Sequence, residues 1–157
     1  MRIWIDADAC PRVVKEVVFK AALRLQIPTT LVANQPIGYP RSTLVNRVTV
    51  GKEIDAADQH IAANATPGDV VVTADIPLAA KLVAQGVVAI DPRGTVYSTA
   101  NVQEALATRN LMQELREAGV AEGGPAPLGP KDRERFANAL DRELTRLLRV
   151  VPAKPAR

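Results

Sequence analysis

The first eleven residues constrain the fold of this chain more than any other stretch. The apolar run Ile-Trp-Ile over residues 3–5 is typical of a strand that is buried on both faces. The sequence then changes abruptly to Asp6-Ala-Asp8, and Pro11 can begin a helix, because proline is tolerated at the first helical position. Residues two apart in an extended segment point the same way, so Asp6 and Asp8 can direct two carboxylates to one point. Like charges this close require a cation or a shared proton, so the stretch indicates a metal site.

Short apolar runs and segments of helical periodicity alternate along most of the chain. This alternation predicts an α/β fold in which a parallel sheet carries helices on both faces. A stretch rich in glycine and proline then predicts a linker before a last amphipathic helix, which we expect to pack on the same domain. The predicted strands cover residues 3–5, 29–33, 45–50, 70–73 and 87–90, and the predicted helices 11–26, 55–65, 76–85, 101–118 and 131–150. The predicted domain covers residues 1–118, the linker 119–130 and a disordered tail 151–157.

The composition is that of an ordinary soluble globular protein, with 47% hydrophobic and 24% charged residues in a chain of 157. No stretch approaches the roughly 20 apolar residues of a membrane span, and no apolar signal region precedes Asp6. We therefore expect a cytoplasmic protein that does not engage a membrane. The single cysteine excludes an internal disulfide and a cysteine-based zinc site. The net charge of +3 gathers in the C-terminal segment, a pattern more typical of a solvated helix face than of a polyanion site.

Aspartates follow three of the predicted strands. Asp6 with Asp8, then Asp75, then Asp91 come at or shortly after the ends of apolar runs. Because neighbouring parallel strands place their carboxyl ends on one rim of the sheet, we expect these carboxylates to lie close together. All-oxygen clusters of this kind hold hard cations, so the expected cofactor is Mg²⁺ or Mn²⁺.

A further aspartate lies on the apolar side of a predicted helix. Asp58 comes four residues after Ile54 and three before Ile61, so all three fall on one stripe of the helix expected over 55–65. A carboxylate that faces the core is costly unless it is paired or coordinated. Asp58 is therefore a candidate to join the metal site.

Each aspartate also has a purely structural interpretation. Asp75 could cap the helix that follows it, and Asp91 could form a turn. Asp8 could help to cap the helix at Pro11, and Asp55 could cap the alanine-rich helix. The grouping of several carboxylates on one rim is less easily explained in this way.

Cys10 and His60 are assigned no chemical role. Cys10 lies near a helix N-terminus, which would favour its thiolate, but the phosphatase pattern with arginine six residues later is absent, because Glu16 stands there. It is more simply a small buried residue. His60 lies two positions past Asp58 and points away from that face, so it is predicted to be a surface residue.

Several blocks of the sequence together resemble the uncharacterised bacterial YaiI/YqxD family. The match extends over nearly the whole chain, through Arg109-Asn110 to the last predicted helix. The blocks are Ile-Trp-Ile-Asp-Ala-Asp-Ala-Cys-Pro (residues 3–11), Asp55-Ala-Ala-Asp58, Val-Val-Thr-Ala-Asp-Ile-Pro-Leu-Ala (71–79), Asp91-Pro-Arg-Gly94 and residues 133–141.

This family is grouped with the PIN-like domains, which include metal-dependent ribonucleases. The resemblance implies a three-layer α/β/α sandwich with a mainly parallel central sheet and acidic residues at the strand ends. By this resemblance Asp6 would be the metal ligand of the first strand, Asp58 that of a helix and Asp75 that of the fourth strand. Asp8 and Asp91 are plausible additions to this ligand set.

The leading functional hypothesis is a Mg²⁺- or Mn²⁺-dependent nuclease, a phosphodiesterase that acts on RNA or single-stranded nucleic acid. The catalytic residues would be Asp6, Asp8, Asp58 and Asp75. Basic residues would hold the phosphates of the substrate. The candidates are Arg41, Arg47, Lys81, Arg93 and Arg109.

Two other functions stay open. A haloacid-dehalogenase-like phosphatase would use Asp6 as its phosphorylated nucleophile and Asp8 as its acid. Thr73, Lys81 and Asp91 then follow in the order in which that superfamily carries its other functional residues. Against this alternative, the helix that begins at Pro11 leaves no room for the flap that such enzymes insert. The third function is a non-catalytic RNA-binding module with a vestigial acidic site, which suits the basic last helix. The sequence does not indicate the oligomeric state.

Overall fold

A computed structural model describes residues 1–120 and 127–150 of the chain. The predicted tail over 151–157 and most of the predicted linker, residues 121–126, lie outside this range. Within it, the strands β1 to β5 form one sheet in the order β3-β2-β1-β4-β5, and every neighbouring pair is parallel. The strands are β1 (Ile3–Asp6), β2 (Thr29–Ala33), β3 (Val45–Thr49), β4 (Val70–Val72) and β5 (Val88–Ile90). The predicted α/β fold with a parallel central sheet is confirmed.

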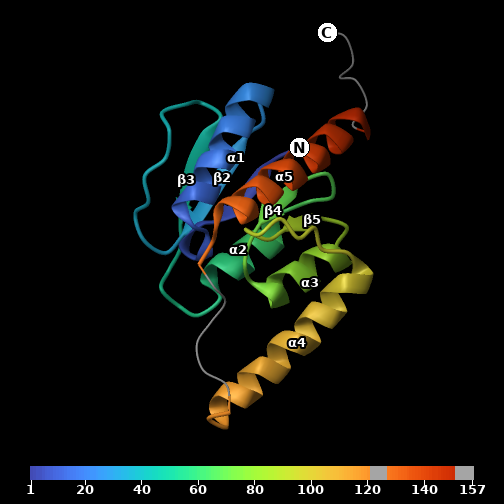
Figure 1. The fold of residues 1–157 in the computed structure, drawn as a ribbon. Coiled ribbons are helices and arrows are strands. Elements are labelled where there is room, and N and C mark those ends of the chain that lie inside the picture. The colour runs from blue at the N-terminus through green and yellow to red at the C-terminus, as the bar shows by residue number, and fades with distance from the viewer. Residues whose placement is uncertain (121–126, 151–157) are drawn as a thin grey trace.

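Helices cover both faces of this sheet and complete a three-layer sandwich. Helices α1 and α5 lie side by side on one face (Figure 1), and α2, α3 and α4 pack on the other. A short 3₁₀ turn over Ala7–Ala9 separates β1 from the first helix. The helices are α1 (Arg12–Leu25), α2 (Ala56–Asn64), α3 (Ile76–Ala84), α4 (Thr99–Glu117) and α5 (Pro130–Val150).

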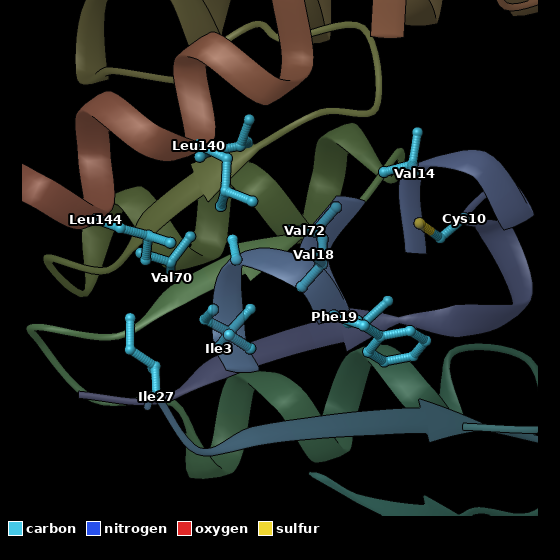
Figure 2. Packing of buried hydrophobic residues seen from close by; sticks show 14 of the residues in the cluster. Ile3, Cys10, Val14, Val18, Phe19, Ile27, Val70, Val72, Leu140 and Leu144 are labelled. Carbon is cyan, nitrogen blue, oxygen red and sulfur yellow. The ribbon is translucent and has the colours of Figure 1, made fainter. Parts of the chain in front are cut away.

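The two faces of β1 contact different cores, because successive side chains of a strand point in opposite directions. Ile3 and Ile5 belong to the cluster between the sheet and α1 with α5. Figure 2 shows Ile3 in this cluster with Val14 and Val18 of α1 and with Leu140 and Leu144 of α5. Trp4 joins the opposite cluster, beneath α2, α3 and α4.

The amino-terminal end of β1 is fixed by one buried carboxylate. Asp69 accepts hydrogen bonds from the indole Nε1 of Trp4 at 3.1 Å and from the backbone N–H groups of Arg2 and Thr66, each at 3.0 Å. These bonds tie the start of β1 to the turn before β4. The prediction that Trp4 is a core residue of the first strand is therefore confirmed, and its polar edge is satisfied as well.

Helix α4 is only partly packed. Val102 near its start is buried, but the helix then extends away from the other elements (Figure 1), and Leu111 is 54% exposed. Met112, the next residue of this predicted helix, is exposed as well. Among the residues that the structure describes, no helix has the length and apolar character needed to cross a membrane.

The turn after β5 approaches the backbone of α5 closely. The backbone N–H of Gly94 donates to the carbonyl of Asp91 at 2.9 Å, and Arg93 forms an ion pair with Asp132 in the first turn of α5 at 3.0 Å. A glycine is required at this turn because its φ is +93° and α5 lies directly against it.

Replacing Gly94 by alanine is expected to lower the free energy of unfolding more than the same change at Gly68. Both glycines have a positive φ, +93° and +98°, so alanine is strained by about 1–2 kcal/mol at either position. A methyl group on Gly94 would also lie 2.7 Å from the carbonyl carbon of Arg135, whereas one on Gly68 meets nothing within 4 Å. Urea unfolding of Gly94→Ala and Gly68→Ala should differ by about 1–3 kcal/mol. Equal losses would contradict the close approach of the turn to α5.

Candidate metal centre

Three aspartates from separate elements reach the same rim of the sheet. Asp6 is the last residue of β1, and Asp75 follows β4 as the N-cap of α3. Because β1 and β4 are neighbours in the sheet, their carboxyl ends place these two residues side by side. Asp58 arrives from the first turn of α2, which packs beside α3.

The tightest group of carboxylate oxygens comes from Asp55, Asp58 and Asp75. One oxygen from each lies within 4.8 Å of the other two. Oxygens on opposite sides of a bound Mg²⁺ or Ca²⁺ are about 4–5 Å apart, so this spacing fits a single hard cation. Residues 1–120 and 127–150 hold no metal-ligating group with this spacing apart from these three.

Asp55 was predicted to cap α2, and that interpretation is wrong. It occupies the N-cap position, but its φ of 69° is left-handed and its side chain accepts no capping hydrogen bond. A capping side chain normally has an extended backbone, which Asp55 lacks. Its carboxylate instead joins the group with Asp58 and Asp75. Only the Asp-x-x-Asp spacing in the sequence could have suggested this role.

Asp58 is buried, with 7% of its surface exposed. Its Oδ2 lies 3.5 Å from the ammonium Nζ of Lys81, whereas its Oδ1 is buried and has no hydrogen-bond partner. Burial raises the pKa of Asp58; the nearby Lys81 lowers it, and the charge of Asp75 raises it further. The stripe that predicted this burial was partly wrong, since Ile54 is 89% exposed and precedes the helix. Ile61, on the same side of α2, is fully buried.

Asp6 is also 7% exposed, and Thr73 holds it in place. The Thr73 hydroxyl donates to Oδ2 of Asp6 at 2.8 Å and accepts the backbone N–H of Asp75 at 3.0 Å. Burial raises the pKa of Asp6, the hydrogen bond from Thr73 opposes that rise, and the charges of Asp75, Asp8 and Asp58 add to it. Thr73 thus links the two strand ends that carry the acidic residues.

Four of these carboxylates share one arrangement, in which a donor fixes one oxygen and leaves the other without a partner. No group within the described part of the chain donates to the second oxygen. Hydrogen bonds of this kind orient metal-binding carboxylates in many proteins. The donors are Thr73 Oγ1 for Asp6 (2.8 Å), the backbone N–H of Leu78 for Asp75 (3.0 Å), the backbone N–H of Asn34 for Asp8 (2.7 Å) and Lys81 Nζ for Asp58 (3.5 Å).

Two hollows of about 350 and 360 Å³ open over the acidic residues and share Asp6, Ala9 and Asp75 in their walls. Because they share these residues, the two hollows are adjacent at the rim, and they are together called the groove here. The first hollow also contains Asp8, Asp55 and Asp58, with Lys52 in its wall, and Arg109 of α4 lines the second.

Asp91 lies outside this groove. Its Oδ1 accepts the backbone N–H groups of Arg93 at 2.8 Å and of Thr95 at 3.3 Å, which closes the turn after β5. It lines neither hollow. The turn-forming interpretation therefore describes Asp91 better than the metal-ligand interpretation does.

The five predicted phosphate-binding residues are dispersed. Arg109 lines the groove, and Lys81 contacts Asp58. Arg47 donates to the carbonyl of Ile37 at 3.0 Å and lies over the ring of Tyr39, so a structural contact already holds its guanidinium. Arg93 pairs with Asp132, and Arg41 is an exposed residue that lines neither hollow. Lys52, which lines the groove, was missed by the sequence reasoning.

Cys10 and His60 have structural surroundings. Burial raises the pKa of the Cys10 thiol to about 12, so a neighbouring helix N-terminus does not produce a thiolate there. His60 is half-buried and packs edge-on against Trp4, with 6.1 Å between the ring centroids. Neither residue lines the groove.

Comparison with known proteins agrees with the motif blocks of the sequence. The model of an uncharacterised bacterial family, YaiI/YqxD, matches residues 4–146. The chain belongs to this family. A UPF0178 protein of Geobacter metallireducens is 56% identical over 149 residues, which are 95% of this chain and 96% of that protein. A UPF0178 protein of Myxococcus xanthus is 53% identical over 152 residues, which are 97% of this chain and 99% of that protein. No solved structure matches the chain.

In the metal-free YaiI/YqxD protein, Asp58→Asn is expected to raise the free energy of unfolding by about 1 kcal/mol at neutral pH, because it removes a buried charge with an unpartnered oxygen. The pKa of Asp58 is raised above its ordinary value of 3.8, so the folded state binds the proton more tightly than the unfolded chain. The Asp58 charge therefore destabilises the folded state more and more as the pH rises from 3.8 through the raised pKa. As the pH falls back toward 3.8, this destabilisation is lost.

Urea unfolding at neutral and mildly acidic pH measures this effect, and the advantage of Asp58→Asn should shrink in acid. Glu104→Gln, at an exposed position on α4, is the matched control and should change little at either pH. A loss of stability in Asp58→Asn at neutral pH would contradict a net cost of burying the Asp58 charge beside Lys81.

Proposed function

We propose that this protein is a Mg²⁺- or Mn²⁺-dependent nuclease that acts on RNA or single-stranded nucleic acid. The observation that carries the proposal is the group of carboxylate oxygens from Asp55, Asp58 and Asp75, which are spaced for one cation and include a buried residue, Asp58, whose Oδ1 has no hydrogen-bond partner. A buried carboxylate oxygen without a partner is costly, and a hard cation is the ligand that would satisfy it.

Asp58, Asp75 and Asp55 would hold the ion, with Asp6 and Asp8 beside it in the groove. When bound, such an ion would polarise a phosphate and lower the pKa of the attacking water. The chain's own donors supply the orientation, because Thr73 and the N-terminus of α3 fix one oxygen each of Asp6 and Asp75. Their free oxygens are then positioned before any ligand arrives.

The shape and charge of the groove support a polymeric substrate. Asp6 and Asp75 line both of its hollows, Arg109 lines one of them and Lys52 lines the other. A nucleic acid strand carries phosphates at regular intervals. If one phosphate lies over the acidic residues, the adjacent phosphates of the strand can contact these two basic residues. Both would then contribute binding energy without touching the reacting atoms.

The phosphatase alternative has less support. It requires Asp6 as an accessible nucleophile, but Asp6 is 7% exposed and Thr73 holds one of its oxygens. Only the 3₁₀ turn and two more residues separate β1 from α1, which is too short for an inserted flap. We therefore do not propose a phosphomonoesterase.

Single-stranded RNA is expected to be cleaved in the presence of Mn²⁺, and Asp6→Asn and Asp58→Asn are expected to cleave it at least about 100-fold more slowly. Losing a group that only hydrogen-bonds to a metal ligand already costs up to about that factor. A labelled RNA analysed on a denaturing gel measures the rate, and a chelator should abolish it. Asp141→Asn on the exposed face of α5 is the matched control and should retain full activity.

Equal cleavage by wild type and Asp6→Asn would sink the proposal, since the activity would then belong to a contaminant. Salt-sensitive RNA binding without turnover under any divalent ion would support the non-catalytic RNA-binding module instead. Hydrolysis of a small phosphomonoester that disappears in Asp6→Asn would support the phosphatase.

A further inference from the structure

One basic side chain forms an ion pair with the acidic group. Lys81 extends from α3 to Asp58, with 3.5 Å between Nζ and Oδ2, and its side chain is 55% exposed. Within the described residues it is the only cation in an ion pair with Asp6, Asp8, Asp55, Asp58 or Asp75. The ammonium therefore neutralises one oxygen of Asp58 and leaves the buried Oδ1 unpartnered.

We propose that Lys81 takes the place of a second divalent ion, so that the acidic group binds a single ion and the ammonium supplies the remaining positive charge. This inference rests on the metal site of the proposed function and adds its stoichiometry. Nucleases and phosphatases that use two ions hold them about 3.5–4 Å apart, commonly across a shared carboxylate. In this chain the buried carboxylate of the acidic group, Asp58, already has Lys81 at its Oδ2, 3.5 Å away.

The geometry excludes a second ion while Lys81 stays in place. An ion bound to Oδ2 of Asp58 would lie about 2.0–2.1 Å from it, within a few ångströms of an ammonium that is itself 3.5 Å from the same oxygen. Positive charges at that separation repel strongly where water is partly excluded. An ion on the opposite oxygen, Oδ1, avoids this contact, so the two oxygens of Asp58 have different partners.

Without Lys81 the group would retain enough negative charge for two ions. Six carboxylates line the groove, Glu53 among them, and the charges of Asp75 and Asp55 add to burial in raising the pKa of Asp58. Removing the ammonium leaves Oδ2 open beside Asp75 and Asp55. The side chain of Lys81 is 55% exposed, so its ammonium is also accessible from solvent.

Titration of the purified full-length protein with MnCl₂ tests the inference by isothermal calorimetry, with free Mn²⁺ followed independently by electron paramagnetic resonance. Wild type is expected to bind one Mn²⁺ per chain and Lys81→Met two. Lys81→Arg, which keeps the charge, should bind one. Lys20→Met, an exposed lysine on α1 away from the groove, is the matched control and should also bind one.

The first ion should bind Lys81→Met at least about tenfold more tightly than wild type, because the repulsion from the ammonium is gone. Lys81→Gln gives a second uncharged variant should Lys81→Met fold poorly, and circular dichroism establishes the fold of each. The readout is ion binding, so it does not depend on nuclease activity.

The outcomes separate the two proposals. One ion in wild type and one in both Lys81→Met and Lys81→Gln would overturn the role of Lys81 and leave the metal site intact. Binding of two ions by wild type would also overturn the role of Lys81 and leave the metal site intact. Binding of no ion by wild type would overturn the metal site itself, and the inference would fall with it.

Discussion

The concentration of negative charge at one rim of the sheet is the constraint on which the rest of this structure depends. Six carboxylates line one groove, and the two most buried of them, Asp6 and Asp58, have raised pKa values because burial and their neighbours disfavour ionisation. One lysine neutralises part of this charge. The remainder opposes folding, so packing elsewhere must hold the rim together. The two cores on either side of the sheet provide that packing.

The chain couples this rim to the cores through very short connections. Ile5 is fully buried, and the next residue, Asp6, is a candidate ligand; Val72 is fully buried, and Thr73 then orients both Asp6 and the backbone of Asp75. A change in core packing of β1 or β4 would therefore move the ligands directly. The opposite end of β1 is fixed as well, because Asp69 binds Trp4 and the backbone of Arg2. Both ends of the central strand thus carry a buried carboxylate. Both oxygens of Asp69 accept hydrogen bonds, whereas Asp6 accepts one at Oδ2 alone.

Sequence reasoning succeeded where a residue's role follows from its position in a repeating pattern. The parallel sheet follows from the alternation of strands and helices, and the closeness of Asp6 to Asp75 follows from the sheet itself. It failed where the partner or the backbone is chosen by tertiary contacts. Nothing local indicates that Asp55 has a left-handed backbone, that Arg47 is held by Ile37 and Tyr39, or that α4 leaves Leu111 exposed. Periodicity also misplaced Ile54, because that residue precedes the helix whose spacing was applied to it.

The charge pattern of the groove has a consequence for the order of events under the proposed function. A phosphate backbone that approached the metal-free groove would meet six carboxylates and be repelled, whatever Arg109 and Lys52 contributed. A bound divalent ion would offset two of those charges and offer a direct ligand to the phosphate. Under the proposed function, the ion would therefore serve to bind the substrate as well as to activate it. Arg109 and Lys52 would then favour a polyanion only once an ion had reduced the negative charge of the groove.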